Sequence, residues 1–217
     1  CGYFVLSLYQ SDVTAIRNRL EIPAHAMAHS IGAIARNADG ALHNIQAALD
    51  NAGEDKFAAE GLHQTIIYRD NISVAISRIA IYDENGLPLL NSKSELTAMG
   101  SVAGYAFFRR QAEAATNEMR VSNLVPDPLD GKPEIVMSRR LTDKSGNFLG
   151  GAAVFVDARY LQQAFDSLQM PAGASITAFN RDGHVVARTP PVHLGDVDIT
   201  TDFSKRSIFR TFRDGPV

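Results

Sequence analysis

The chain lacks several features that would place it in a common functional class. A single cysteine, Cys1, excludes an internal disulfide, so cysteine content says nothing about the compartment. Basic residues are not in excess, because 21 lysines and arginines stand against 24 aspartates and glutamates, for a net charge of −3. Phosphate backbones are bound by clustered basic surfaces, so we expect no nucleic-acid partner.

Catalytic and metal-binding signatures are also missing. There is no Gly-x-Ser-x-Gly, no HExxH, no phosphate-cradling glycine loop and no usable Cys–His pair. Glu21, His25 and His29 lie one turn apart on an expected helix, but ligands from one exposed helix make a weak metal site. A solvated helix face is the preferred interpretation. We therefore expect no catalysis, no metal and no cofactor in this chain.

The first nine residues are apolar and aromatic but too short to cross a bilayer. Two interpretations stay open. The segment is either the outer end of a transmembrane helix, with Tyr3 and Tyr9 near the interface, or the hydrophobic start of an element in a soluble protein. A lipid-modified Cys1 is a third, weaker alternative.

Residues 11–51 have the periodicity of a helix. Pro23 divides the pattern, where a proline in the first turn of a second helix is tolerated. Beyond Pro23, apolar residues recur at steps of three and four, as in a two-helix seam. This stripe consists of Met27, Ile31, Ile34, Ala38, Leu42, Ile45 and Leu49. The helix would be about 40 Å long and would serve as a spine for two modules, as a dimerisation stalk, or as both.

Further helices and strands alternate along the rest of the chain. Helices are expected over 54–68, 103–116 and 158–168. Strands are expected on both sides of the Asn85-Gly86 turn and over 120–124, 134–141 and 148–156.

The hairpin around Gly86 has a second copy. "RIAIYDENGLPLLN" (78–91) matches "SITAFNRDGHVVAR" (175–188), with Asp83 over Asn180 and Gly86 over Gly183 at a constant offset of 97 residues (183 minus 86). Each copy begins where a helix and a short loop end, which predicts two modules of one type. The second would be incomplete, because only "FSKRSIFRTF" remains as a candidate helix.

Arg139 and Arg140 are adjacent in an expected strand, so their side chains point to opposite faces. One of them should face inward, and a buried guanidinium needs an anionic partner. That partner is either a bound ligand or a protein carboxylate, Asp143 or Asp157. The expected strand 148–156 returns alongside 134–141, so the arginines lie near the turn and Asp157 lies at the opposite end of the strand pair. This separation argues against a direct Arg140–Asp157 ion pair. Asp157 is also a candidate N-cap of the next helix.

The segment "SRRLTDKSGNFLGGAAVFVDARYL" (138–161), the helix with "YAFF" and the second hairpin together resemble the double Cache sensor fold. This fold is also called the tandem PDC fold and is PAS-like, and the resemblance covers 24–212. It implies an α+β fold in which a long N-terminal helix precedes two PAS-like modules with antiparallel sheets, the second incomplete. The implied divisions are a membrane-adjacent segment and helix (1–51), a membrane-distal module (52–168) and the start of a membrane-proximal module (169–217).

The same resemblance implies a function. Members of the family sit between two transmembrane helices of bacterial sensor histidine kinases and diguanylate cyclases, in the inner membrane and facing the periplasm or the outside. The expected ligand is a small carboxylate or amino acid in the distal module, and the long helix is a candidate homodimer contact. The alternative is a module that binds no metabolite and works through dimerisation or protein contact.

The resemblance also implies site residues. The family's Arg-x-aromatic-aromatic stretch reads Tyr105-Ala-Phe107-Phe108 here, with Tyr105 in place of the arginine. Arg109 or Arg110, one helical turn later, would supply the missing positive charge. Asp157 matches an acidic position that holds the ligand's ammonium group in amino-acid-binding relatives. The expected ligand-binding residues are Tyr105, Phe107, Arg109, Arg110, Ser138, Arg139, Arg140 and Asp157.

Overall fold

The computed structural model describes residues 13–52, 62, 64–66, 73–93, 100–127, 131–168, 170, 175–189 and 204. The fold is α+β, with a long N-terminal helix and two antiparallel sheets among the described residues. The chain divides into two compact units, Ile34–Asp157 and Cys1–Ala33 with Ala158–Val217. The expected distal and proximal modules, with boundaries at 52 and 169, stay a prediction.

The larger sheet lies within the unit Ile34–Asp157 and has five described strands in the order β2-β1-β5-β4-β3, all antiparallel to their neighbours. The strands are β1 (Ile76–Asp83), β2 (Pro88–Asn91), β3 (Arg120–Pro126), β4 (Pro133–Thr142) and β5 (Phe148–Asp157). The sheet confirms the expected hairpin and the three later strands to within two residues at each end.

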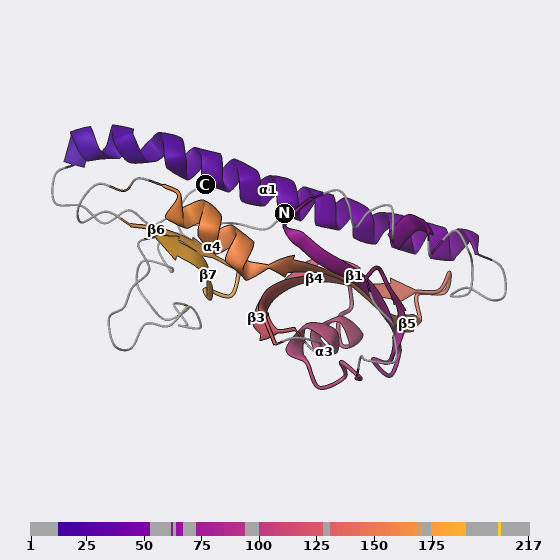
Figure 1. Cartoon of the computed structure of the whole chain (residues 1–217). Coiled ribbons are helices and arrows are strands. Elements are labelled where there is room, and N and C mark those ends of the chain that lie inside the picture. The colour runs from indigo at the N-terminus through magenta and orange to yellow at the C-terminus, as the bar shows by residue number, and fades with distance from the viewer. Residues whose placement is uncertain are drawn as a thin grey trace. The chain divides into compact units, whose positions relative to one another are not determined.

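The two faces of this sheet carry different side chains. Rows of paired residues such as Ala80–Ala153 and Tyr82–Gly151 face α3 (Ala106–Ala112), which buries Phe107 and Phe108 against them. Alternate rows such as Ile79–Val154 and Ile81–Ala152 face the other way. Figure 1 shows the sheet curving around α3, while the later part of α1 runs along the opposite face. Helix α3 is shorter than the expected 103–116.

Helix α1 (Val13–Asn51) is continuous, so the expectation that Pro23 divides it is wrong. A proline inside a helix removes one backbone hydrogen bond, at a cost of about 3 kcal/mol. Burial of the apolar stripe on the same helix offsets this cost, because Leu42, Ile45 and Leu49 are at most 1% exposed. The stripe is thus covered within this chain and is not an open seam for a second helix.

Two glutamine amides bind backbone groups of β4 beyond the end of its pairing with β3. The Gln46 amide of α1 accepts a hydrogen bond from the Thr142 backbone NH and donates to its carbonyl, at 3.1 and 3.0 Å. The buried Gln111 of α3 accepts from the Arg140 NH and donates to the Ser138 carbonyl, at 3.1 and 2.6 Å. Each amide replaces the neighbouring strand that β4 lacks at that point.

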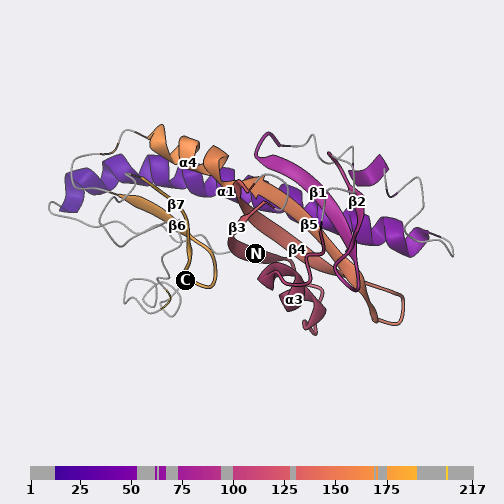
Figure 2. The same cartoon turned by 60° about the horizontal axis from the view of Figure 1, so that its bottom comes forward.

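The smaller sheet belongs to the unit that contains Ala158–Val217. Its described strands, β6 (Ile176–Phe179) and β7 (Val185–Thr189), form an antiparallel hairpin. Helix α4 (Ala158–Asp166) packs on β7, where the Gln162 amide binds the NH and carbonyl of Arg188, at 3.3 and 2.7 Å. Figure 2 shows β6 and β7 side by side, and they are the two strands among the described residues after Ala158.

The two hairpins that match in sequence also have the same hydrogen bonds in their turns. The Asp83 side chain accepts from the NH groups of Asn85 and Leu87, at 2.9 and 2.7 Å. The Asn180 side chain, 97 residues on (180 minus 83), accepts from the corresponding NH groups of the second turn, both at 3.0 Å. The glycines at the expected positions, Gly86 and Gly183, have φ of 75° and 85°, which only glycine adopts at low cost.

Several expectations lie outside the described residues. These are the apolar start with Tyr3 and Tyr9, most of the helix at 54–68, and the "FSKRSIFRTF" helix apart from Ser204. Within 54–68, Leu62 and 64–66 are helical, and Leu62 and Ile66 are buried as expected.

Candidate functional site

The most unusual polar group on the α3 face of the larger sheet is Arg78, in the middle of β1. Its side chain is 3% exposed. The guanidinium carbon lies 3.7 Å from the ring centroid of Phe155, the residue paired with Arg78 on β5. Stacking on an aromatic face is a favourable environment for a guanidinium, but a charge buried this deeply still requires anionic partners.

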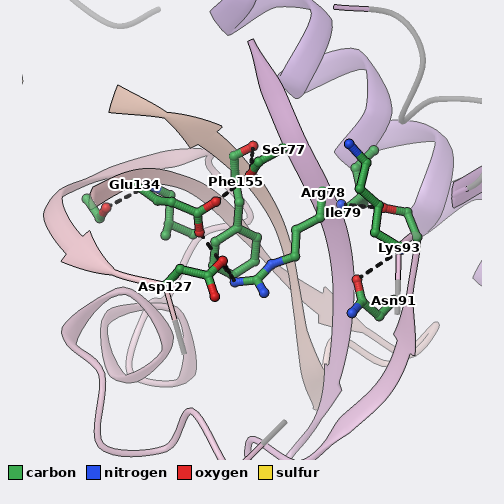
Figure 3. Close-up of polar contacts among 11 residues, drawn as sticks. Ser77, Arg78, Ile79, Asn91, Lys93, Asp127, Glu134 and Phe155 are labelled. Carbon is green, nitrogen blue, oxygen red and sulfur yellow. Dashed lines mark hydrogen bonds and ion pairs between the residues drawn. The ribbon is translucent and has the colours of Figure 1, made fainter. Parts of the chain in front are cut away.

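Two carboxylates supply that charge, and both approach the same nitrogen. Arg78 Nη2 lies 3.2 Å from Oδ2 of Asp127 and 3.4 Å from Oε2 of Glu134. Glu134 is at the start of β4 and Asp127 directly follows β3, so the pairing of these two strands brings them together. The Ser77 hydroxyl donates to the other Glu134 oxygen. Figure 3 shows Arg78 reaching from β1 across Phe155 to both acids. We call Arg78, Asp127 and Glu134 together the charge cluster.

The charge cluster contains more acid than base. Burial raises the pKa of Glu134 to about 7, although the Ser77 hydrogen bond and the Arg78 charge lower it. The contact with Asp127 adds to the rise, because it favours a proton on Glu134. Near neutral pH the Glu134 carboxyl is therefore divided between its protonated and ionised forms.

Some polar atoms at this site have no hydrogen-bond partner among the described residues. They are Nε and Nη1 of Arg78 and the hydroxyl of Tyr82, which is fully buried. Burial also raises the pKa of the Tyr82 phenol, so it stays a neutral hydrogen-bond donor. Buried polar atoms of folded proteins are rarely unpaired, so three together mark a place where a further group would be stabilised.

Aromatic rings enclose these atoms on the α3 side. The Phe107 ring lies 6.5 Å from Tyr82, 6.0 Å from Phe155 and 5.8 Å from Tyr105, measured between centroids. Phe108 lies 6.4 Å from Tyr82. The surroundings of the charge cluster are therefore apolar, and hydrogen bonds within it are less screened than at the surface.

Five of the expected site residues lie on this side of the sheet or on the segment that covers it. Tyr105 and Phe107 belong to the aromatic enclosure, and Ser138 contacts the Phe107 carbonyl at 3.5 Å. Asp157 pairs with Glu134 in the β4–β5 register and follows the same alternation as Phe155, which places it beside the charge cluster. Arg140 faces α3 further along, where it donates to the Ala114 carbonyl.

The other three expected residues lie elsewhere. Arg139 faces α1, where it forms an ion pair with Asp39 and donates to the Asn117 carbonyl. Arg109 and Arg110 are exposed on α3. Each of the two adjacent arginines therefore has a protein partner on its own face of the sheet, Asp39 for Arg139 and the Ala114 carbonyl for Arg140. A ligand contact of any of the eight residues stays a prediction.

Sequence reasoning missed Arg78, Tyr82, Asp127 and Glu134. The signal for Arg78 and Glu134 was present, since each is a charged residue within an apolar strand. The argument applied to Arg139 and Arg140 applies equally to Arg78 in "ISRIAIYD" and to Glu134 in "PEIVMSRR". Nothing local distinguishes Asp127, because its role depends on the β3–β4 pairing.

Two further observations concern the described part of the chain. No three His, Cys, Asp or Glu side chains gather there in a way that would hold a metal ion. None of the helices within it has a segment long and apolar enough to cross a membrane. His25 and His29 are exposed on α1.

No protein-family model matches the chain, and no curated protein sequence matches it. Solved structures do. The extracellular domain of the protein designated histidine kinase rpHK1S-Z16 is 19% identical, with a TM-score of 0.69 over 90% of this chain and 76% of that one. The ligand-binding domain of the Campylobacter jejuni chemoreceptor Tlp3, in complex with 4-methylisoleucine, is 14% identical, with a TM-score of 0.59 over 81% and 68%.

A third solved structure is the ligand-binding domain of the Pseudomonas aeruginosa amino acid chemoreceptor PctC in complex with GABA. It is 15% identical, with a TM-score of 0.61 over 80% of this chain and 76% of that one. At such identities the likeness establishes the fold and not the ligand. All three matched structures are extracellular or ligand-binding domains of bacterial receptors, and the match extends over the long helix and the sheets of this chain. The chain has the double Cache-like fold of the extracellular sensor domains of histidine kinases and chemoreceptors.

Proposed function

We propose that the chain is the extracytoplasmic ligand-sensing domain of a membrane-bound bacterial signalling protein, in the first place a sensor histidine kinase. Its fold is that of extracellular domains with this role, including one assigned to a histidine kinase. Flanking transmembrane helices would hold it at the inner membrane, facing the periplasm or the outside. The output activity, kinase or cyclase, would belong to a cytoplasmic part of the same protein.

The ligand is a small carboxylate or amino acid, bound between the sheet and α3. The observation that carries this proposal is the set of unpartnered buried atoms on Arg78 and Tyr82. Leaving a buried donor without an acceptor costs about 1–3 kcal/mol, and a ligand carboxylate would remove that cost. Tyr105 and Phe107 would contribute the apolar enclosure and Asp157 a further charge.

Transmission of the signal would use the opposite face of the same sheet. There, Arg139 and Thr142 of β4 are held to α1 through Asp39 and Gln46. A ligand that fits one arrangement of the sheet better than another shifts the population toward it, by no more than its difference in affinity. These polar contacts would carry that shift from β4 into α1.

The rival function, a module that senses through protein contact, has one observation in its favour. Bulky rings fill the space beside Phe107, where an open cavity would favour a ligand. Against it, the apolar stripe of α1 proposed as a dimer seam is buried within the chain. A homodimer through the long helix would therefore use other faces of α1.

A thermal-shift screen with L-amino acids, GABA, and mono- and dicarboxylic acids tests the ligand-binding function. We expect at least one compound to raise the Tm, since ligand bound only by the folded state stabilises it. The shift should disappear in Arg78→Lys, which keeps the charge but loses two nitrogen donors, and persist in the exposed control Arg181→Lys. A flat response to every compound in the wild-type domain would exclude a metabolite sensor of this class.

A further inference from the structure

The smaller sheet carries a half-buried guanidinium that has no carboxylate partner among the described residues. Arg188 of β7 is paired with Thr177 of β6 in the hairpin register, so both side chains lie on the same face of the sheet. The backbone of β7 is fixed at this point, because the Gln162 amide of α4 binds the Arg188 NH and carbonyl, at 3.3 and 2.7 Å. These residues all belong to the unit that contains Ala158–Val217.

The charge of Arg188 is compensated less well than that of the arginines buried in the larger sheet. Arg78 and Arg139 each pair with at least one carboxylate. The side chain of Arg188 instead bonds to two neutral hydroxyls of the described part of the chain. Burial lowers the pKa of Arg188, because these surroundings disfavour the positive charge. An anion beside the guanidinium would remove this penalty.

The groups around this guanidinium are donors that lack acceptors. Arg188 Nη1 donates to the Thr177 hydroxyl at 2.9 Å, and Nη2 donates to the Ser175 hydroxyl at 3.2 Å. Each hydroxyl accepts through its oxygen in that contact and keeps its own hydrogen to donate. No described residue accepts either hydrogen, although Thr177 is only 1% exposed, and Arg188 Nε is buried without a partner. Three donors and one positive charge are therefore gathered here without an acceptor.

We propose that Arg188, Thr177 and Ser175 form a second binding site, which takes a small oxyanion. A carboxylate, phosphate or sulfate brings a negative charge and several acceptor oxygens, and the planar guanidinium fork suits two of those oxygens. The two hydroxyl hydrogens can then be donated to the same anion, so that buried donors are paired as they are in most folded proteins. The site lies within the smaller unit and does not depend on the ligand proposed for the larger sheet.

The Nε–H group of Arg188 gives a direct test, because it is buried and unpartnered. The whole 217-residue chain is labelled with heavy nitrogen and titrated with sodium phosphate, sodium sulfate and sodium acetate. The NMR signal of this group is identified by its loss in Arg188→Lys. We expect at least one oxyanion to shift the signal saturably, whereas sodium chloride at equal ionic strength, which reproduces only the screening, should not. A preference for acetate would assign the site to carboxylates, and a preference for phosphate or sulfate to tetrahedral oxyanions.

Variants of the hydroxyls separate binding from a purely structural role. Thr177→Val keeps the shape of the side chain and removes one donor, so it should weaken oxyanion binding by about tenfold. Ser175→Ala makes the same test at a less buried position, should Thr177→Val fail to fold. The matched control is Arg181→Gln, which removes an exposed charge from the turn of the same hairpin and should bind the oxyanion as the wild type does.

An Arg188 signal that no oxyanion moves would overturn the inference, and so would hydroxyl variants that bind as tightly as Arg181→Gln. Either result would leave the proposed sensor function standing. Conversely, a failed amino-acid screen would leave this site unaffected, because its occupancy is read from the signal of Arg188 itself.

Discussion

Arg139 of β4 forms an ion pair with Asp39 of α1, 100 residues earlier in the chain. The guanidinium is 8% exposed and the carboxylate 41%, so the pair has a buried end and a solvated end. The contact fixes the sheet to the long helix on the face away from α3. If the domain signals by moving its sheet, we expect this ion pair to transmit the movement to α1 and not to contact the ligand.

Asp39→Ala should therefore lower the free energy of unfolding by about 1–3 kcal/mol, because it leaves a buried guanidinium without its anion. Urea unfolding measures this change. Asp50→Ala, at an exposed position of the same helix, should change the free energy by less than about 0.5 kcal/mol. Ligand affinity should be unchanged in Asp39→Ala, and a loss of affinity would place Arg139 at the site after all.

Tyr82→Phe should have opposite effects on stability and binding. Removing a buried hydroxyl that has no partner among the described residues should stabilise the ligand-free domain by about 1 kcal/mol, seen as a higher Tm. The same change should weaken ligand binding by about tenfold, since it removes one hydrogen bond. The exposed Tyr160→Phe serves as the control and should alter neither. Destabilisation by Tyr82→Phe would show that the hydroxyl already has a partner.

Glu134 should make the ligand-free domain less stable as the pH rises. Its pKa is about 7 in the folded state against an ordinary 4.5, so between these values the folded state keeps a proton that the unfolded state has lost. The free energy of unfolding is therefore unaffected by this group below pH 4.5 and falls, by a total on the order of 3 kcal/mol, as the pH rises to about 7. The measurement is the difference between wild type and Glu134→Gln in urea unfolding from pH 4.5 to 8. A constant difference would contradict it.

Gly150 should be the least replaceable glycine of β5. Its φ is 140°, and an added Cβ would lie 2.0 Å from the Tyr82 carbonyl oxygen on β1. Gly150→Ala should cost roughly 3 kcal/mol or more, because backbone atoms of a paired strand cannot move aside. Gly146→Ala is the matched control, with φ of 86° and no atom within 4 Å of the added Cβ, and should cost only about 1–2 kcal/mol. Equal costs would mean that β1 and β5 separate readily.

The strands and turns could be predicted because their signals are local. The Asp83 and Asn180 turns each need a side-chain acceptor at the first position and a glycine three residues later, and both are visible in the sequence. The expectation that Pro23 divides the helix was wrong because the cost of a proline inside α1 is offset by the burial of Leu42, Ile45 and Leu49, about 20 residues later in the same helix. Helix propensity cannot report on that compensation.

The candidate site was predicted only in part, for a similar reason. The resemblance pointed, through Tyr105, Phe107 and Asp157, to the face of the sheet on which the candidate site lies. Alternation along a strand shows that the side chains of Arg139 and Arg140 point to opposite faces, but not which face faces the candidate site. The charge cluster joins β1, β3 and β4, so its members become neighbours only once the strand order is known.

The glutamine amides at Ser138, Arg140 and Thr142 have a consequence for association. A strand end with free NH and carbonyl groups is a template on which a second molecule can add a strand and begin to aggregate. Gln46 and Gln111 already occupy those groups on β4. At this point the sheet cannot be extended by another copy of the chain, which lowers the tendency of the domain to aggregate through this edge.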